Sequence, residues 1–265
     1  MTHTGYTIHT RAGFRYADEG PSHGKGTLLL LHGMMGEVGN WEHTIGTLAS
    51  EGYRVLVPIL PVYAMPMKQT HLPGLVDFVI SFMDEMRVSS AVVSGNSLGG
   101  HIALLLAIGH SDRVRALVLA GASGIYEVDM GQSVMRRKDR DYLRERAAIT
   151  FYDPKHATEE LVDDIYKTVN DRPRAVRLIK MARSVKAENV RDELEAIQVP
   201  TLLVWGRDDE ITPPDVAVTF NELIGSSELH WIDECGHAPM MERPEQFNEI
   251  MLDFLGRVTA YEAVA

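Results

Sequence analysis

The chain has 265 residues, of which 45% are hydrophobic and 24% charged, enough to bury a core as one domain with room for an insertion. Its net charge of −11 argues against non-specific binding to nucleic acid, and no apolar run approaches the roughly 18 residues of a membrane span. The N-terminus lacks the apolar stretch of a signal peptide, and the single cysteine, Cys235, excludes an internal disulfide. We therefore expect a cytoplasmic protein that binds neither nucleic acid nor membrane.

The first 120 residues alternate strand-like and helix-like segments. The run 27–31 is apolar without alternation, which is typical of a strand covered on both faces of a parallel sheet. Asn40 is the expected N-cap of the first helix. The predicted strands lie at 6–9, 13–18, 27–31, 53–57, 91–94 and 114–120, and the predicted helices at 41–50, 74–86 and 97–109. This alternation indicates a mostly parallel sheet with helices on both faces.

The alternation stops between residues 122 and 191, where the pattern favours helices only. Thr158 can cap one of them, ahead of apolar residues at helical spacing. Between Met130 and Arg191 there are 15 basic and 10 acidic residues, a charge of +5, so the remainder of the chain carries −16. The change in periodicity and charge predicts a helical cap inserted into an acidic core. The alternative is that these charged residues are ordinary solvent-exposed residues on helix surfaces.

The parallel-strand pattern resumes with a strand at 200–205, a helix that starts near Thr212 and a last strand at 228–232. A closing helix carries apolar residues on one face between 247 and 255, and we expect the tail 259–265 to be frayed. The predicted fold class is α/β, a doubly wound sheet with an inserted lid. Residues 1–121 and 192–265 form the predicted core, and 122–191 form the cap.

Ser97 lies between a predicted strand and a predicted helix, flanked by Gly95 and Gly99. A serine at such a junction adopts a strained turn, and the glycines remove side chains that would clash. The turn exposes the hydroxyl at the positive end of the following helix, where a developing anion is stabilised. Ser97 is therefore the candidate nucleophile.

Two more polar loops follow predicted strands. Asp208 and Asp209 come after the strand at 200–205, and His237 comes after the strand at 228–232. Parallel strands end at the same edge of a sheet, so these loops can meet Ser97 although they are distant in sequence. The imidazole of His237 can take the proton from Ser97, and a carboxylate behind it can hold the correct tautomer. The order Ser97, acid, His237 predicts a catalytic triad.

Four motifs in this order resemble those of the α/β-hydrolase superfamily, in particular its small lidded esterases and its meta-cleavage-product hydrolases, which cleave C–C bonds. The motifs are His32-Gly33, Gly95-Asn96-Ser97-Leu98-Gly99-Gly100, Trp205-Gly206-Arg207-Asp208-Asp209 and Gly236-His237. The resemblance implies an α/β-hydrolase fold over essentially the whole chain. Its usual Gly-x-x-Asp spacing selects Asp209 as the acid, with Asp208 as the alternative.

The resemblance also implies an oxyanion hole formed by the backbone N–H groups of Met34 and Leu98. We expect His32 to shape the loop that carries Met34, His101 to pack beside the elbow helix, and Cys235 to be a buried apolar residue rather than a nucleophile. The candidate pocket residues are Gly33, Met35, Asn96 and Met240.

The first functional expectation is a serine hydrolase that cleaves carboxylic esters of modest size through an acyl-enzyme. The alternative is a C–C bond hydrolase, in which an arginine of the basic cap holds a substrate carboxylate. Those enzymes commonly carry a tryptophan after the histidine, where this chain has Ala238-Pro239-Met240. A third possibility is a ligand-binding member of the fold without turnover.

The expected partner is a small ester, with the chain as a monomer or homodimer. No group of side chains has metal-ligand spacing, and there is no nucleotide-binding fingerprint, so neither a metal nor a cofactor is expected.

Overall fold

The structure is a computed structural model that describes residues 5–128 and 136–262. Within these residues one sheet has the strand order β1-β2-β4-β3-β5-β6-β7-β8. The pairs β1–β2 and β2–β4 are antiparallel, and all pairs from β4 to β8 are parallel. The strands are β1 (Ile8–Arg11), β2 (Phe14–Glu19), β3 (Thr27–Leu31), β4 (Arg54–Pro58), β5 (Ala91–Asn96), β6 (Val114–Ala120), β7 (Thr201–Gly206) and β8 (Ser227–Ile232).

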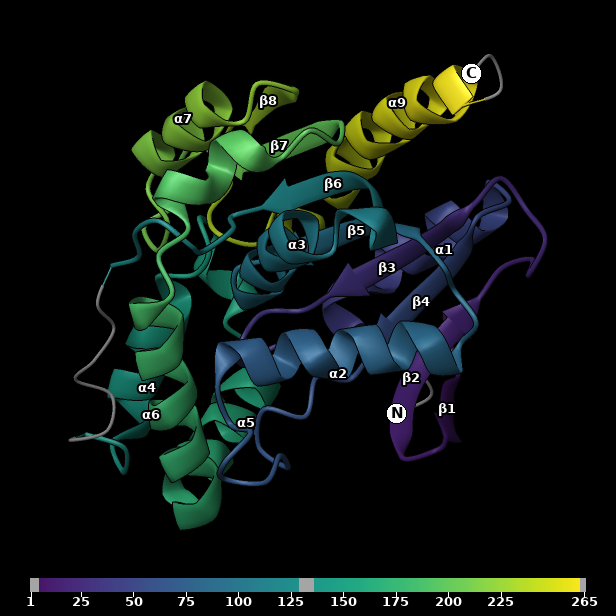
Figure 1. The fold of residues 1–265 in the computed structure, drawn as a ribbon. Helices are drawn as coiled ribbons and strands as arrows, with labels where there is room; N and C mark the ends of the chain where they lie inside the picture. Colours follow the sequence, from purple (N-terminus) through teal and green to yellow (C-terminus); the bar gives the residue numbers. More distant parts are fainter. Residues whose placement is uncertain (1–4, 129–135, 263–265) are drawn as a thin grey trace.

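Helices cover both faces of the sheet, as Figure 1 shows. In β3 the buried side chains alternate between two core clusters: Leu28 and Leu30 pack on the side of α1 and α9, and Leu29 and Leu31 pack on the side of α2, α3 and α7. This explains the continuous apolar run, because each face needs its own apolar residues. The helices are α1 (Glu42–Ser50), α2 (Leu72–Glu85), α3 (Leu98–Gly109), α7 (Pro214–Leu223), α8 (Pro239–Glu242) and α9 (Pro244–Glu262).

The described part of the segment between β6 and β7 contains helices and no strand. Its helices are α4 (Arg140–Ala148), α5 (Glu159–Asn170) and α6 (Arg172–Ala187). They lie on the side toward which the arrowheads of the central strands point (Figure 1). Thr158 caps α5, since its hydroxyl accepts a hydrogen bond from the N–H of Leu161. We call residues 122–191 the cap, as in the sequence-based division of the chain.

Two helices begin at other residues than the sequence predicts. Asn40 does not cap α1, because its side-chain oxygen accepts the N–H of Glu37 in a preceding 3₁₀ turn, and α1 starts at Glu42. The α2 helix begins at Leu72, since the ring of His71 accepts the N–H of Gly74 and caps it. Both differences come from side-chain caps that apolar periodicity does not reveal.

The last helix also differs from the prediction. The α9 helix continues to Glu262, through residues expected to be frayed, and residues 263–265 lie outside the described part of the chain. None of the described helices is both long enough and apolar enough to cross a membrane.

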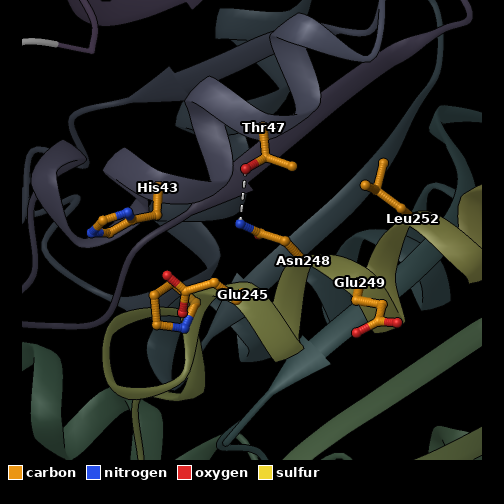
Figure 2. Close-up of a pocket in the computed structure, with 7 residues that line it drawn as sticks. His43, Thr47, Glu245, Asn248, Glu249 and Leu252 are labelled. Atoms are coloured by element: carbon orange, nitrogen blue, oxygen red, sulfur yellow. Dashed lines mark hydrogen bonds between the residues drawn. The ribbon is translucent and has the colours of Figure 1, made fainter.

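A hollow of about 390 Å³ lies between α1 and α9 (Figure 2). Its lining includes Thr47 of α1 and Asn248 of α9, whose amide nitrogen donates to the Thr47 hydroxyl at 3.1 Å. None of the predicted site residues lines this hollow, so it is separate from the candidate active site.

Candidate active site

The backbone at Ser97 has φ 53° and ψ −118°, between the end of β5 and the start of α3. A non-glycine residue with such angles is strained, typically by about 1–3 kcal/mol, and persists because its surroundings enforce it. A Cβ added at Gly95 would lie 2.3 Å from the backbone of Gly99, and one added at Gly99 would lie 2.1 Å from the carbonyl oxygen of Leu31. The flanking positions therefore admit only glycine, as the Gly-x-Ser-x-Gly pattern predicts.

Asp209 and His237 are buried and lie in direct contact at the ends of β7 and β8. The imidazole Nδ1 is 2.9 Å from one carboxylate oxygen of Asp209 and 3.1 Å from the other. The same carboxylate accepts the backbone N–H groups of Ile211 and Thr212, and the hydroxyl of Thr212 at 2.9 Å. These donors fix the carboxylate, so Nδ1 of His237 donates to it and Nε2 remains to accept a proton.

The structure places Asp209, and not Asp208, behind the histidine. Asp208 is exposed to solvent, as is Glu210, whereas Asp209 is only 3% exposed. Thr212, expected only to start a helix, instead binds Asp209, and α7 begins two residues later.

Burial and nearby carboxylates have opposite effects on the pKa of His237. Burial, the largest single influence, would lower this pKa, but the charge and hydrogen bond of Asp209, together with nearby carboxylates, raise it above its ordinary value. The carboxylates of Glu127 and Glu242 add to this effect. The site can therefore stabilise the imidazolium that forms when His237 accepts a proton.

Ser97 and His237 are joined through the side chain of Asn96 and the end of β6. The Asn96 amide nitrogen donates to the carbonyl oxygens of Ala120 and His237, each at 2.9 Å. Gly121 has φ 50°, and a Cβ there would lie 2.9 Å from Nδ1 of His237. Asn96, predicted as a pocket residue, is thus a buried tether between the elbow and the histidine loop, and its contact with a substrate stays a prediction.

His32 joins the loop after β3 to the segment that follows β4. Its Nε2 accepts the N–H of Leu60 at 3.0 Å, so its proton is on Nδ1, which is 2.8 Å from the carbonyl oxygen of Gly33. Burial lowers the pKa of His32 to about 4, so the ring is neutral at pH 7. A Cβ at Gly33 would lie 3.5 Å from that of Ser97, which brings this loop next to the nucleophile. His32 therefore shapes the loop, as expected.

The N–H groups of Met34 and Leu98 have no acceptor among the described residues. Leu98 is the first residue of α3, where backbone N–H groups have no partner inside the helix. The carbonyl of Met34 accepts the hydroxyl of Tyr63 at 3.2 Å, which restrains the loop. Both groups are thus available to bind an oxyanion near Ser97.

The other candidate residues have different surroundings. Met35 is 39% exposed, and Met240 is 2% exposed and belongs to the apolar core with Phe247. His101 is buried in α3, where burial lowers its pKa to about 4, as expected for a packing residue. Cys235 is buried, and burial together with the charge of Glu242 raises the pKa of its thiol. A protonated thiol is a poor nucleophile.

The cap contacts the site through α6. The guanidinium of Arg174 lies 6.0 Å from the ring centroid of Tyr63, whose hydroxyl holds Met34. Arg177 of the same helix donates to the carbonyl of Met65 at 2.9 Å. Arg174 forms no ion pair with any described residue, whereas several other basic residues of the cap do. Such pairs are Arg136–Asp139, Arg140–Glu159, Arg144–Glu159, Lys155–Asp153 and Lys167–Asp164.

Three further residues bond to the site and were not predicted as part of it: Tyr63, Thr212 and Glu242. The signal for Thr212 was its place three residues after Asp209, the reach of a side chain across a turn. Tyr63 bonds to Met34, and Glu242 bonds to Tyr152 of the cap as well as to nearby Gly236; local patterns give no sign of the distant partners. Among the described residues, no group of three or more His, Cys, Asp and Glu side chains is placed to hold a metal ion.

Residues 26–244 match the family model described as alpha/beta hydrolase fold. The chain belongs to this family. The match confirms the predicted superfamily and fold class, and identifies the protein as a hydrolase.

Proteins similar to this hydrolase include a dienedioate hydrolase and a meta-cleavage product hydrolase. It is 29% identical over 264 residues to the 2-hydroxy-6-oxononadienedioate/2-hydroxy-6-oxononatrienedioate hydrolase of Paraburkholderia phymatum, covering 91% of this chain and 90% of that one. The solved meta-cleavage product hydrolase CumD, known from Pseudomonas fluorescens IP01, matches with a TM-score of 0.82 and 26% identity, covering 97% of this chain and 100% of that one. The alpha/beta hydrolase MGS-MChE2, from the metagenome of lagoon sediments of Mar Chica, Morocco, matches with a TM-score of 0.78 and 32% identity, covering 95% and 98%.

Proposed function

We propose that this protein hydrolyses a C–C bond next to a ketone in an acidic, vinylogous diketo substrate of the meta-cleavage-product type. The observation that carries the proposal is the position of Arg174, an unpaired cap arginine among the described residues, above Tyr63 and the oxyanion loop. An arginine binds a carboxylate through two parallel hydrogen bonds, which suits an acid substrate better than a neutral ester. The names of the relatives, which act on 2-hydroxy-6-oxo dienoates, support the same substrate class.

In this mechanism Ser97 adds to the ketone while His237 takes its proton. The N–H groups of Met34 and Leu98 bind the oxyanion, and Asp209 stabilises the imidazolium. In the diketo tautomer of the substrate the C–C bond then breaks, and its electron pair forms a dienolate conjugated with the second ketone. The imidazolium gives its proton to the carbon that was bonded to the attacked ketone. Water, activated by His237, hydrolyses the resulting acyl-Ser97 ester and releases a carboxylic acid.

Ester hydrolysis is the second candidate, although it was the first expectation from the sequence. It uses the same nucleophile, base and oxyanion hole, with an alcohol as the leaving group. It is favoured by the segment Ala238-Pro239-Met240, which starts α8 where the meta-cleavage enzymes commonly carry a tryptophan.

The test compares 2-hydroxy-6-oxo-6-phenylhexa-2,4-dienoate with p-nitrophenyl butyrate. We expect a higher kcat/KM for the dienoate, and we expect Arg174→Met to raise KM for the dienoate about tenfold or more while changing KM for the neutral ester little. Arg183→Met is the matched control, because Arg183 is an exposed residue of the same helix. Turnover of the ester alone would overturn the C–C proposal and leave the ester candidate.

A further inference from the structure

Glu242 is a buried carboxylate that the proposed mechanism does not use. It is 6% exposed, at the end of α8, and no described Arg, Lys or His side chain forms an ion pair with it. A buried carboxylate without a cation requires hydrogen-bond donors that replace its water shell. The strongest donors to Glu242 are backbone N–H groups from two different parts of the fold, and the Cys235 thiol also donates to it.

One carboxylate oxygen of Glu242 bonds to the histidine loop, the segment that carries His237. It accepts the N–H of Gly236 at 2.8 Å, and the Cys235 thiol lies 3.9 Å away. Gly236 directly precedes His237, so this bond fixes the peptide next to the proposed base. Hydrogen bonds from N–H groups to an ionised carboxylate are shorter and stronger than those to a neutral acceptor.

The other carboxylate oxygen of Glu242 accepts hydrogen bonds from the cap. It accepts the N–H of Tyr152 at 2.8 Å and that of Asp153 at 3.4 Å, in the connection between α4 and α5. The same cap segment meets the histidine loop directly, because the N–H of His237 donates to the carbonyl of Thr150 at 2.8 Å.

The two segments leave no space for a side chain between them. A Cβ at Gly236 would lie 2.8 Å from the carbonyl oxygen of Thr150 and 2.9 Å from the nitrogen of Tyr152. The cap connection and the histidine loop are thus in backbone contact, and Glu242 bonds to both at once.

We propose that Glu242 is a positioning residue that joins the cap to the histidine loop and holds His237 in place for proton transfer, which rests on the role of His237 under the proposed function. Two properties are required of it. Its length lets the two oxygens reach both segments, and its charge strengthens the bonds to the N–H groups. The charge also acts on His237, which faces the carboxylates of Asp209, Glu127 and Glu242.

Two substitutions separate charge from reach. Glu242→Gln keeps the length but loses the charge and places an NH₂ group against a backbone N–H. Glu242→Asp keeps the charge but is shorter by one methylene and cannot span both segments. Glu245→Gln is the matched control, because Glu245 is exposed and lies three residues further along the chain.

The first measurement is the rate at which a fluorophosphonate labels the protein as a function of pH, which requires the triad but not the C–C substrate. We expect Glu242→Gln to lower the rate about ten- to a hundredfold, since small misplacements of a catalytic group have effects of this size. The acidic limb of the pH–rate profile of Glu242→Gln should move to lower pH, because removal of a negative charge lowers the pKa of His237. Glu242→Asp should lower the rate without moving the limb, and Glu245→Gln should change neither.

The second measurement is amide hydrogen exchange at Gly236 and Tyr152, which does not depend on catalysis. Both amides should exchange faster in the two Glu242 variants than in the wild type or in Glu245→Gln. Wild-type labelling rates in folded Glu242→Gln and Glu242→Asp, or unchanged exchange at these amides, would overturn the inference. Failure of the wild type to turn over the dienoate, with labelling and exchange as expected, would count against the substrate proposal alone.

Discussion

The sheet core and the cap are stabilised in different ways. In the core, strand residues such as Leu30 are fully buried and pack between the sheet and helices on both faces. The apolar cluster within the cap has three buried members, Tyr142, Leu143 and Val169. Cap arginines such as Arg140 and Arg144 form ion pairs at the surface. The side chains of the proposed triad belong to the core, whereas Arg174, the proposed substrate anchor, belongs to the cap. The proposed catalytic side chains and the proposed substrate anchor thus lie in two parts of the fold that are stabilised differently, so a substitution in one part can be tested for its effect on kcat and in the other for its effect on KM.

The largest expected effect is the loss of kcat when Asp209, the proposed triad carboxylate, is replaced. Asp209→Asn should lower kcat about 10³- to 10⁴-fold, because an amide cannot hold the same imidazole tautomer or stabilise the imidazolium. Asp208→Asn is the control, since Asp208 is exposed and should retain activity. Equal losses in the two variants, measured by steady-state kinetics, would contradict the assignment of the acid.

The next effect tests the packing of the core. Leu30→Ala should reduce the free energy of unfolding by about 2–5 kcal/mol, because it removes a fully buried side chain and leaves a cavity. Urea denaturation monitored by circular dichroism measures it. A change below about 1 kcal/mol would show that β3 is less tightly packed than its burial indicates.

A smaller loss of kcat is expected from a change at Tyr63, which contacts both the loop that carries Met34 and Arg174 of the cap. Tyr63→Phe removes the hydroxyl that holds the carbonyl of Met34, and one such hydrogen bond contributes about 1 kcal/mol, so kcat should fall about fivefold. The ring under Arg174 remains, so KM should change little. Burial raises the pKa of Tyr63 to about 12, so the effect should be the same between pH 6 and 9. A loss confined to KM would assign Tyr63 to substrate binding instead.

The smallest effect is expected at the surface of the cap. Arg144 pairs with Asp141 and Glu159, and all three side chains are solvent-accessible. Arg144→Gln should leave the urea midpoint unchanged within error, because exposed ion pairs contribute little to stability. A clear decrease would mean that the cap depends on its ion pairs more than the core comparison suggests.

Much of the core could be predicted from sequence because its signals are local. The apolar runs of β3 and β7 and the glycines around Ser97 each follow from a short pattern, whereas the choice of Asp209 over Asp208 was implied only by the resemblance to the α/β-hydrolase superfamily. The predicted N-cap at Asn40 was wrong and the N-cap at His71 was missed, because helix capping depends on the rotamer of a single side chain. Glu242 and Tyr63 could not be found, because Tyr152 and Met34, their partners in other segments, lie far away in the sequence and meet them only in the folded chain.

The most direct test of the triad is mass spectrometry after treatment with a fluorophosphonate. The protein should gain one adduct per chain, located on the peptide that contains Ser97, and Ser97→Ala should gain none while retaining its circular dichroism spectrum. An adduct on another residue, or undiminished labelling of Ser97→Ala, would contradict the account.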